Sequence, residues 1–235
     1  MTLTIFVLFC CVFCRNYVGV IKFRLCWMMI VFILTQSCII RNLSKKQFKV
    51  LLDISLKLNE LRNCAVEITS LIKSADGKHY EKLNFKHVIG KVKEEFKDYY
   101  SCIQVGIAGA TIKKHVDSFN AYIVLKNMKV DGEFDRCLNE PKKHDDDCLH
   151  NIIIPRGFIT SSKKKLAEGY IELPLSREYK RGLESNGCRL HIKIPENICD
   201  KDIIQVEIIP INNGRMFKAN FTYSVKKEAC DLDKN

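Results

Sequence analysis

The stretch HDDDCLH at 144–150 holds the strongest candidates for metal chemistry in this sequence. Four imidazole or carboxylate side chains there could serve as ligands for a cation: His144, Asp145, Asp147 and His150. Consecutive carboxylates on an extended loop point in different directions, however, and the alternating acidic spacing of a calcium-binding loop is missing. Lys142 and Lys143 also partly neutralise the acidic charge. The sequence therefore favours a solvated loop tip over a metal site.

No motif in the sequence specifies a reaction. A nucleophile elbow, a zinc-protease helix, a phosphate-binding loop and a dinucleotide-binding fingerprint are all missing. His191 alternates outward in a predicted strand, with no carboxylate or nucleophile close to it in sequence. These observations indicate no cofactor, leave enzymatic activity uncertain and favour a binding protein over an enzyme.

The chain has 12 cysteines, and five of them lie in or next to an apolar N-terminal segment. The remaining seven are disulfide candidates: Cys64, Cys102, Cys137, Cys148, Cys188, Cys199 and Cys230. In an oxidising compartment most would pair, and the odd one would stay free, bond another molecule or pair with Cys38. Ten residues separate Cys137 from Cys148, and ten separate Cys188 from Cys199, which suits two small disulfide loops. Spacing alone does not fix the connectivity.

Two triplets match the acceptor pattern for N-linked glycosylation, one at Asn42 and one at Asn220. Around Asn220 the residues from 217 to 225 alternate between apolar and polar, which is the period of a half-buried strand. Asn220 falls on the polar side and is therefore expected to face water, where a glycan has room.

The first 40 residues contain no Asp or Glu and predict a hydrophobic leader over 1–40. Apolar runs at 3–14 and 25–40 flank a stretch with Arg15, Lys22 and Arg24. The second run is typical of a secretory signal cleaved after Ser37, or of an uncleaved signal anchor. In an alternative, translation starts at Met28 or Met29. The expected location is extracellular, or else a single-pass membrane protein with its C-terminal domain outside.

The net charge of +11 indicates the class of partner. The chain remains basic when the leader is set aside, but the excess consists mostly of scattered lysines with no aromatic-basic motif. Nucleic acid is disfavoured for this reason and because the predicted topology places the chain across a membrane. The expected partners are an extracellular protein, an acidic glycan or a lipid surface, with membrane contact through the leader if it is not cleaved.

Apolar residues recur at steps of three and four from Leu51 to Ile72 and again from Phe85 to Ile103. The first series predicts an amphipathic helix that begins near Ser44, and the second predicts its antiparallel partner. Gly106 and Gly109 are expected to end or kink the second helix, with a short third helix at 111–119. The helical region is thus expected to span 43–119.

From Asn120 onward the apolar period changes to two, and six segments read as strands: 121–130, 151–159, 169–176, 188–195, 203–211 and 217–225. Asn212, Asn213 and Gly214 form a hairpin-turn signal between the last two. The β-rich region is expected over 120–230, either as one domain with the helices or as a second domain in tandem. The predicted fold class is α+β, with an N-terminal helical hairpin followed by a mainly antiparallel β-sheet or sandwich.

Together these features favour a secreted or surface-displayed, disulfide-stabilised binding protein, whose β half or acidic loop contacts a protein or glycan. The alternative is a secreted lipid-binding or membrane-active protein, whose amphipathic helices cover an apolar cavity or reach a bilayer. A third class is a secreted hydrolase with a site assembled from distant residues.

Overall fold

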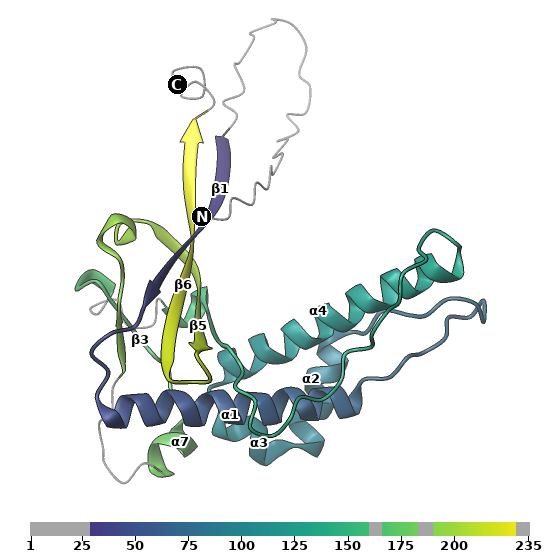
Figure 1. The fold of residues 1–235 in the computed structure, drawn as a ribbon, viewed down its shortest axis with the longest axis horizontal. Coiled ribbons are helices and arrows are strands. Elements are labelled where there is room, and N and C mark those ends of the chain that lie inside the picture. The colour runs from purple at the N-terminus through teal and green to yellow at the C-terminus, as the bar shows by residue number, and fades with distance from the viewer. Residues whose placement is uncertain (1–28, 160–165, 183–189, 229–235) are drawn as a thin grey trace, which may run out of the picture.

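The computed structural model describes residues 29–159, 166–182 and 190–228, and it combines helices with antiparallel sheets (Figure 1). The helices are α1 (Lys45–Ile68), α2 (Phe85–Glu95), α3 (Lys97–Cys102), α4 (Val105–Val130), α5 (Arg156–Ile159), α7 (Arg177–Gly182) and the short 3-10 helix η1 (Glu196–Ile198). The strands are β1 (Met29–Ile39), β2 (Ile152–Pro155), β3 (Tyr170–Glu172), β4 (His191–Lys193), β5 (Asp202–Ile211) and β6 (Met216–Glu228). The fold is therefore α+β, as the sequence predicts.

A four-stranded antiparallel sheet with the order β1-β6-β5-β2 forms the centre, and β3 and β4 make a separate two-stranded sheet. The predicted alternation of β6 is confirmed. Phe217, Ala219 and Phe221 are fully buried and Tyr223 is 8% exposed, whereas Asn220 on the other face is half-buried. One face of the sheet thus joins the core and the opposite face carries polar side chains, as is common for antiparallel sheets.

Helix α1 is amphipathic, as the three-four periodicity predicts, but it ends at Ile68, and Ile72 of the predicted series is exposed beyond it. It begins with a capping box in which the Ser44 side chain accepts a hydrogen bond from the Gln47 amide, while the Gln47 side chain accepts one from the Ser44 amide. Its apolar stripe is buried, and the Phe48 ring packs edge-on against Phe217 of β6 at 5.5 Å between centroids. Residues of the helices and of both sheets belong to one hydrophobic core.

Residues 29–39, which the sequence analysis assigns to the leader, form strand β1 in the structure. This strand pairs with β6 along its whole length, from Met29 opposite Glu228 to Ile39 opposite Lys218. An uncharged apolar run satisfies a signal sequence and a sheet strand equally well, so composition alone could not separate them. The predicted cleavage point after Ser37 falls inside β1, and the rest of the leader, residues 1–28, lies outside the described residues.

Several expectations for the middle of the chain are wrong. The helix predicted from Phe85 to Ile103 is divided at Phe96 into α2 and α3, and the short helix predicted at 111–119 is part of α4. Gly106 and Gly109 do not break a helix but lie near the start of α4, whose N-cap Gln104 accepts hydrogen bonds from the Gly106 and Ile107 amides. The predicted strand at 121–130 is the second half of the same helix. None of the helices in the described part of the chain is long and apolar enough to cross a membrane.

The predicted turn at 212–214 is confirmed as the connection between β5 and β6, and Gly214 is confined there in two ways. Its φ is +76°, and an added Cβ would collide with the side chain of Leu149 and lie 2.9 Å from that of Leu52. Asn212 and Asn213 also have positive φ, of 52° and 53°. The turn therefore requires a residue without a side chain at position 214.

Gly214→Ala is expected to lower the free energy of unfolding by about 1–3 kcal/mol, because it combines an unfavourable φ with crowding against leucine side chains. Gly77→Ala is the matched control, since Gly77 has a φ of +66° and no atoms within 4 Å of its added Cβ. Chemical denaturation measures the free energy of unfolding of both variants, and the difference between their losses gives the cost of crowding apart from the cost of the positive φ. Equal losses in the two variants would show that crowding at Gly214 contributes nothing.

Candidate functional site

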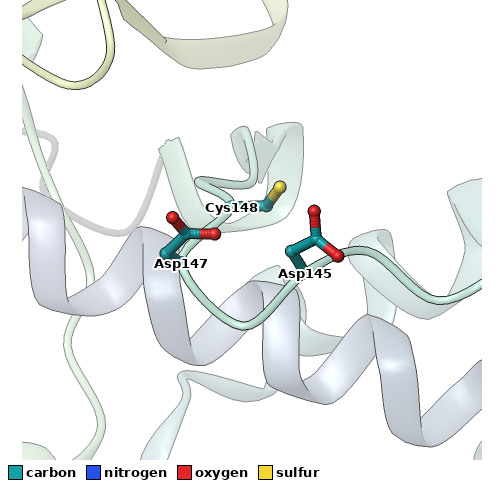
Figure 2. Close-up of side chains that lie close together, drawn as sticks. All are labelled: Asp145, Asp147 and Cys148. Carbon is teal, nitrogen blue, oxygen red and sulfur yellow. The ribbon is translucent and has the colours of Figure 1, made fainter.

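The acidic loop does not assemble the four predicted metal ligands. Asp145 and Asp147 come together with Cys148 instead, with ligand atoms that all lie within 4.8 Å of one another (Figure 2). His144 and His150 are not part of this group. The side chains of Asp145 and Asp147 are exposed, as expected for a solvated loop tip, and exposed acidic groups of this kind are common without a bound ion.

The backbone of this loop is fixed by polar side chains of α1. Asn59 donates to the Asp145 carbonyl at 2.7 Å and Arg62 donates to the Lys142 carbonyl at 2.8 Å. Further along, the Asn63 side chain bonds both main-chain groups of His144. The Ser55 hydroxyl donates to the His150 carbonyl, and the Ser55 main-chain carbonyl accepts from the His150 amide. These contacts separate the two histidines from the aspartates. The His150 ring is turned inward, where burial lowers its pKa to about 4.

A groove between β1 and β4 is the stronger candidate for a binding site. It has a volume of about 740 Å³, and two consecutive stretches of chain, 38–42 and 191–197, line it together with Tyr170. Asn197 of η1 donates to Gln36 of β1 at 2.9 Å and so connects the two walls. Because the walls are continuous stretches of extended chain, main-chain atoms as well as side chains border the groove.

The β1 wall of the groove is a free sheet edge. In the described structure β1 has a neighbour only on the β6 side, and just beyond β1 the Ile40 amide donates to the Phe217 carbonyl at 2.9 Å. Main-chain groups alternate in direction along an antiparallel strand. The amide and carbonyl of Ile39 therefore point away from β6, and Arg41 occupies the next outward position.

The β4 wall of the groove is also a free sheet edge. Among the described strands β4 pairs only with β3, and the Ile194 amide donates to the Gly169 carbonyl at 2.8 Å. By the same alternation, the main-chain groups of His191 and Lys193 point away from β3. Among the residues that the structure describes, two sheet edges thus present main-chain groups without a hydrogen-bond partner to one groove.

The side chains of the groove combine an apolar lining with positive charge. Ile192 and Ile194 are buried in the core, whereas Arg41 is exposed and the Lys193 side chain is 65% exposed. The hydrogen bond from Lys193 to Glu196, 3.1 Å long, raises the pKa of the lysine, which is therefore cationic at neutral pH. A guanidinium and an ammonium group therefore flank an apolar slot.

His191 lies in this wall facing outward, as its alternation in the sequence predicts. Its ring packs edge-on with Tyr170 at 6.4 Å between centroids, and its Nε2 lies 3.9 Å from the Glu172 carboxylate, which is beyond hydrogen-bonding distance. This Nε2 is buried without a hydrogen-bond partner among the described residues. A ligand or a bound water could satisfy it.

A second groove lies between α4 and the β2 edge, with a volume of about 750 Å³. Its two lysines are already paired, Lys113 with Asp117 at 2.8 Å and Lys114 with Glu207 at 2.9 Å. The acidic partners Asp117 and Glu207 also line this groove, so its walls carry no net charge, whereas Arg41, Lys193 and Glu196 leave one excess positive charge in the groove between β1 and β4.

All six cysteines within the described residues are free thiols: Cys38, Cys64, Cys102, Cys137, Cys148 and Cys199. Cys188 and Cys230 lie outside the described residues, so the predicted pairing of Cys188 with Cys199 stays a prediction. Cys137 and Cys148 are both present and are not joined.

Both glycosylation candidates lie within the described structure. Asn42 is exposed, has a φ of 59° and borders the groove between β1 and β4. Asn220 is half-buried on the polar sheet face, where its Oδ1 accepts a 2.7 Å hydrogen bond from Ser37.

No known protein family matches the chain, and no curated protein is significantly similar to it in sequence. The functional argument therefore depends on the geometry of the groove. The sequence carries no pattern that predicts this site, because its walls are separated by about 150 residues of chain. Only the outward alternation of His191 and Lys193 indicates one side of it.

Proposed function

We propose that this protein is an exported binding protein that captures another protein in the groove between β1 and β4. The observation that carries the proposal is the pair of free sheet edges facing one cationic, partly apolar slot. Unused main-chain groups at a sheet edge are a ready template for association with a second chain. In this proposal the predicted helical hairpin within 43–119 serves as the scaffold beneath the sheet.

Binding is favoured over catalysis by the state of the groove's reactive side chains. Cys38 lines the groove near His191, but burial raises the pKa of its thiol and disfavours the nucleophilic thiolate. A lipid carrier is also disfavoured, since the two grooves described above carry charged residues in their walls.

Export is supported by the acid-free N-terminal segment and by its first apolar run at 3–14. Since 29–39 forms a sheet strand, the proposal assigns the targeting signal to residues before Met29. A C-terminal tag should be protected from protease in microsomes of a secretory cell that makes the full chain. A tag that remains accessible in the cytosol would end this part of the proposal.

Export also predicts the redox state of the cysteines. If the protein is exported, thiol titration of the secreted form should leave about one or two of the seven cysteines after residue 41 reactive, because an oxidising compartment favours pairing. The five of these that the structure describes are free thiols there, so this pairing would join cysteines that the structure leaves apart. Mass spectrometry without reduction would identify the bonds. Seven reactive thiols would instead indicate a reducing compartment.

Affinity capture tests the binding function itself. The purified chain should retain specific proteins from the extracellular medium of its own source, and Arg41→Glu combined with Lys193→Glu should release them. Lys113→Glu is the control, because that exposed lysine lies in the other groove. Retention that is identical for the wild type and the double variant would place the binding surface elsewhere.

A further inference from the structure

We infer that the groove between β1 and β4 receives an extended acidic segment of the partner, which adds a strand to one or both sheet edges. This inference rests on the binding function proposed above and specifies its ligand. The reasons are the direction of the unused main-chain groups, the length of the groove walls and the sign of the charge.

The main-chain groups favour an extended chain over a helix or a compact ligand. Ile39 on one wall, and His191 and Lys193 on the other, present their amides and carbonyls outward by strand alternation. Outward groups on a strand recur at every second residue, a spacing that another strand matches. Strand addition would therefore satisfy hydrogen-bonding groups on both walls with a single occupant.

The dimensions agree with a short segment. The β1 wall comprises 38–42 and the β4 wall comprises 191–197. An extended chain rises about 3.3 Å per residue, so five residues on one wall face a segment of roughly the same length. A volume of about 740 Å³ also lies within the range of sites that enclose a ligand.

The charge of the groove selects an acidic segment. Arg41 is exposed at the end of one wall, and Lys193 stands on the opposite wall. Glu196 pairs with Lys193, but both side chains are largely exposed, so an incoming carboxylate can compete with that pairing. Arginine additionally offers a planar fork that binds a carboxylate through two hydrogen bonds. The net charge of +11 would also speed the approach of an acidic chain.

The direct test uses end-blocked synthetic peptides of about seven residues that alternate Glu with Val. The acidic peptide should bind the purified full chain in a calorimetric or anisotropy titration, and the same peptide with Lys in place of Glu should bind at least about tenfold more weakly. N-methylation of alternate amides provides the test of geometry. Methyl groups on either set of alternate amides should weaken binding if the peptide lies between the two edges, and on only one set if it pairs with a single edge, because alternate amides of a strand point to opposite sides.

Variants of the protein locate the site. Ile39→Pro removes an amide that points away from β6, so it should weaken peptide binding while preserving the fold, as circular dichroism would check. Arg41→Ala and Lys193→Ala should each weaken binding of the acidic peptide several-fold. Lys218→Ala is the control, since Lys218 lies opposite Ile39 on the neighbouring strand and does not line the groove.

Three outcomes would overturn the inference: no binding of the acidic peptide, equal binding of the Lys peptide, or insensitivity to both methylation patterns. Sedimentation that reveals a dimer, lost in Ile39→Pro, would assign the edge to a second copy of this chain instead. These failures are distinguishable from failure of the proposed function. If the wild-type chain still captures a protein through Arg41 and Lys193 but binds no peptide, the binding function stands and strand addition is wrong.

Discussion

Phe221→Ala is expected to lower the free energy of unfolding by about 3–5 kcal/mol. The Phe221 side chain is fully buried on β6, the strand that pairs with both β1 and β5. Truncation would leave a cavity between the sheet and the helices, and the central position of β6 limits how far its neighbours can collapse into it. Urea denaturation followed by circular dichroism measures the loss.

Asn220→Gln is the matched control for this variant, because Asn220 is the adjacent residue on the opposite face. Its 2.7 Å hydrogen bond with Ser37 is partly exposed, so the change should cost at most about 1 kcal/mol. In a secretory cell the same variant should abolish a mobility shift caused by deglycosylation. A Gln variant that fails to fold would show that Asn220 has a structural role that its polar surroundings do not suggest.

The elements that the sequence predicts correctly are those with local signals. In α1, the capping box at Ser44 and the apolar periodicity lie within one helix. The β5–β6 hairpin combines strict alternation with a turn of residues that tolerate positive φ. For both elements, the residues that specify the structure are close together in the chain.

The second half of α4 shows why alternation alone can mislead. Residues 121–130 alternate well enough to suggest a strand, but Phe119 and Ile123 are both buried one helical turn apart. Asn127 and Asn120 further hold the helix in place by hydrogen bonds to the main chain of Tyr80 and Leu83. Those contacts with an irregular segment leave no periodic signal in the sequence.

Strand β1 and the groove depend on pairing between distant parts of the chain. Thr35 of β1 lies opposite Thr222 of β6. The residues that make the apolar run 29–39 part of a sheet therefore lie 187 positions further along the chain. The groove needs in addition the placement of β4 beside the end of β1. Neither relation has a local signature, and so the sequence predicted the outward direction of His191 but not the wall that faces it.

Acidification from pH 6.5 to 4 is expected to lower the stability of the protein through two inward-facing histidines. His115 is 4% exposed on α4, and burial, aided by the positive charge of Arg62, lowers its pKa to about 4. Burial lowers the pKa of His150 to about 4 as well. Nearby positive charges lower it further, and the opposing effect of the Glu207 carboxylate is smaller. Both rings are therefore neutral in the folded protein at pH 7.

The direction of this change in stability follows from how many protons the folded and the unfolded chain bind. Each histidine has a folded pKa below its unfolded value of about 6.5, so between these values the unfolded chain binds more protons. Stability is unaffected above that window and falls as the pH drops through it, by about 3 kcal/mol for each ring at the lower end. Two such losses are a large part of the 5–15 kcal/mol that typically separates folded from unfolded chains.

Burial also lowers the pKa of His144, which therefore acts in the same direction, but its smaller burial makes it a lesser contributor. Asp76 and His79 act outside this window or against the trend. The pKa of Asp76 is lowered to about 2, mainly by hydrogen bonds from His79, so its stabilising effect is lost only at still lower pH. His79 itself has a raised pKa, because it bonds Asp76 and Asp131, and its contribution is lost as the pH rises rather than as it falls. Acid sensitivity between pH 6.5 and 4 therefore reports chiefly on His115 and His150.

The double variant His115→Gln with His150→Gln removes both titrations. It should be less stable than the wild type at pH 7, because the 3.0 Å contact between the His115 ring and Thr69 is lost. Its urea midpoint should nevertheless change much less than that of the wild type as the pH is lowered from 7.5 to 4.5. His87→Gln serves as the control, since His87 is an exposed residue of α2. If the wild type and the double variant lost stability in parallel, the buried histidines would not be the groups that make the fold sensitive to acid.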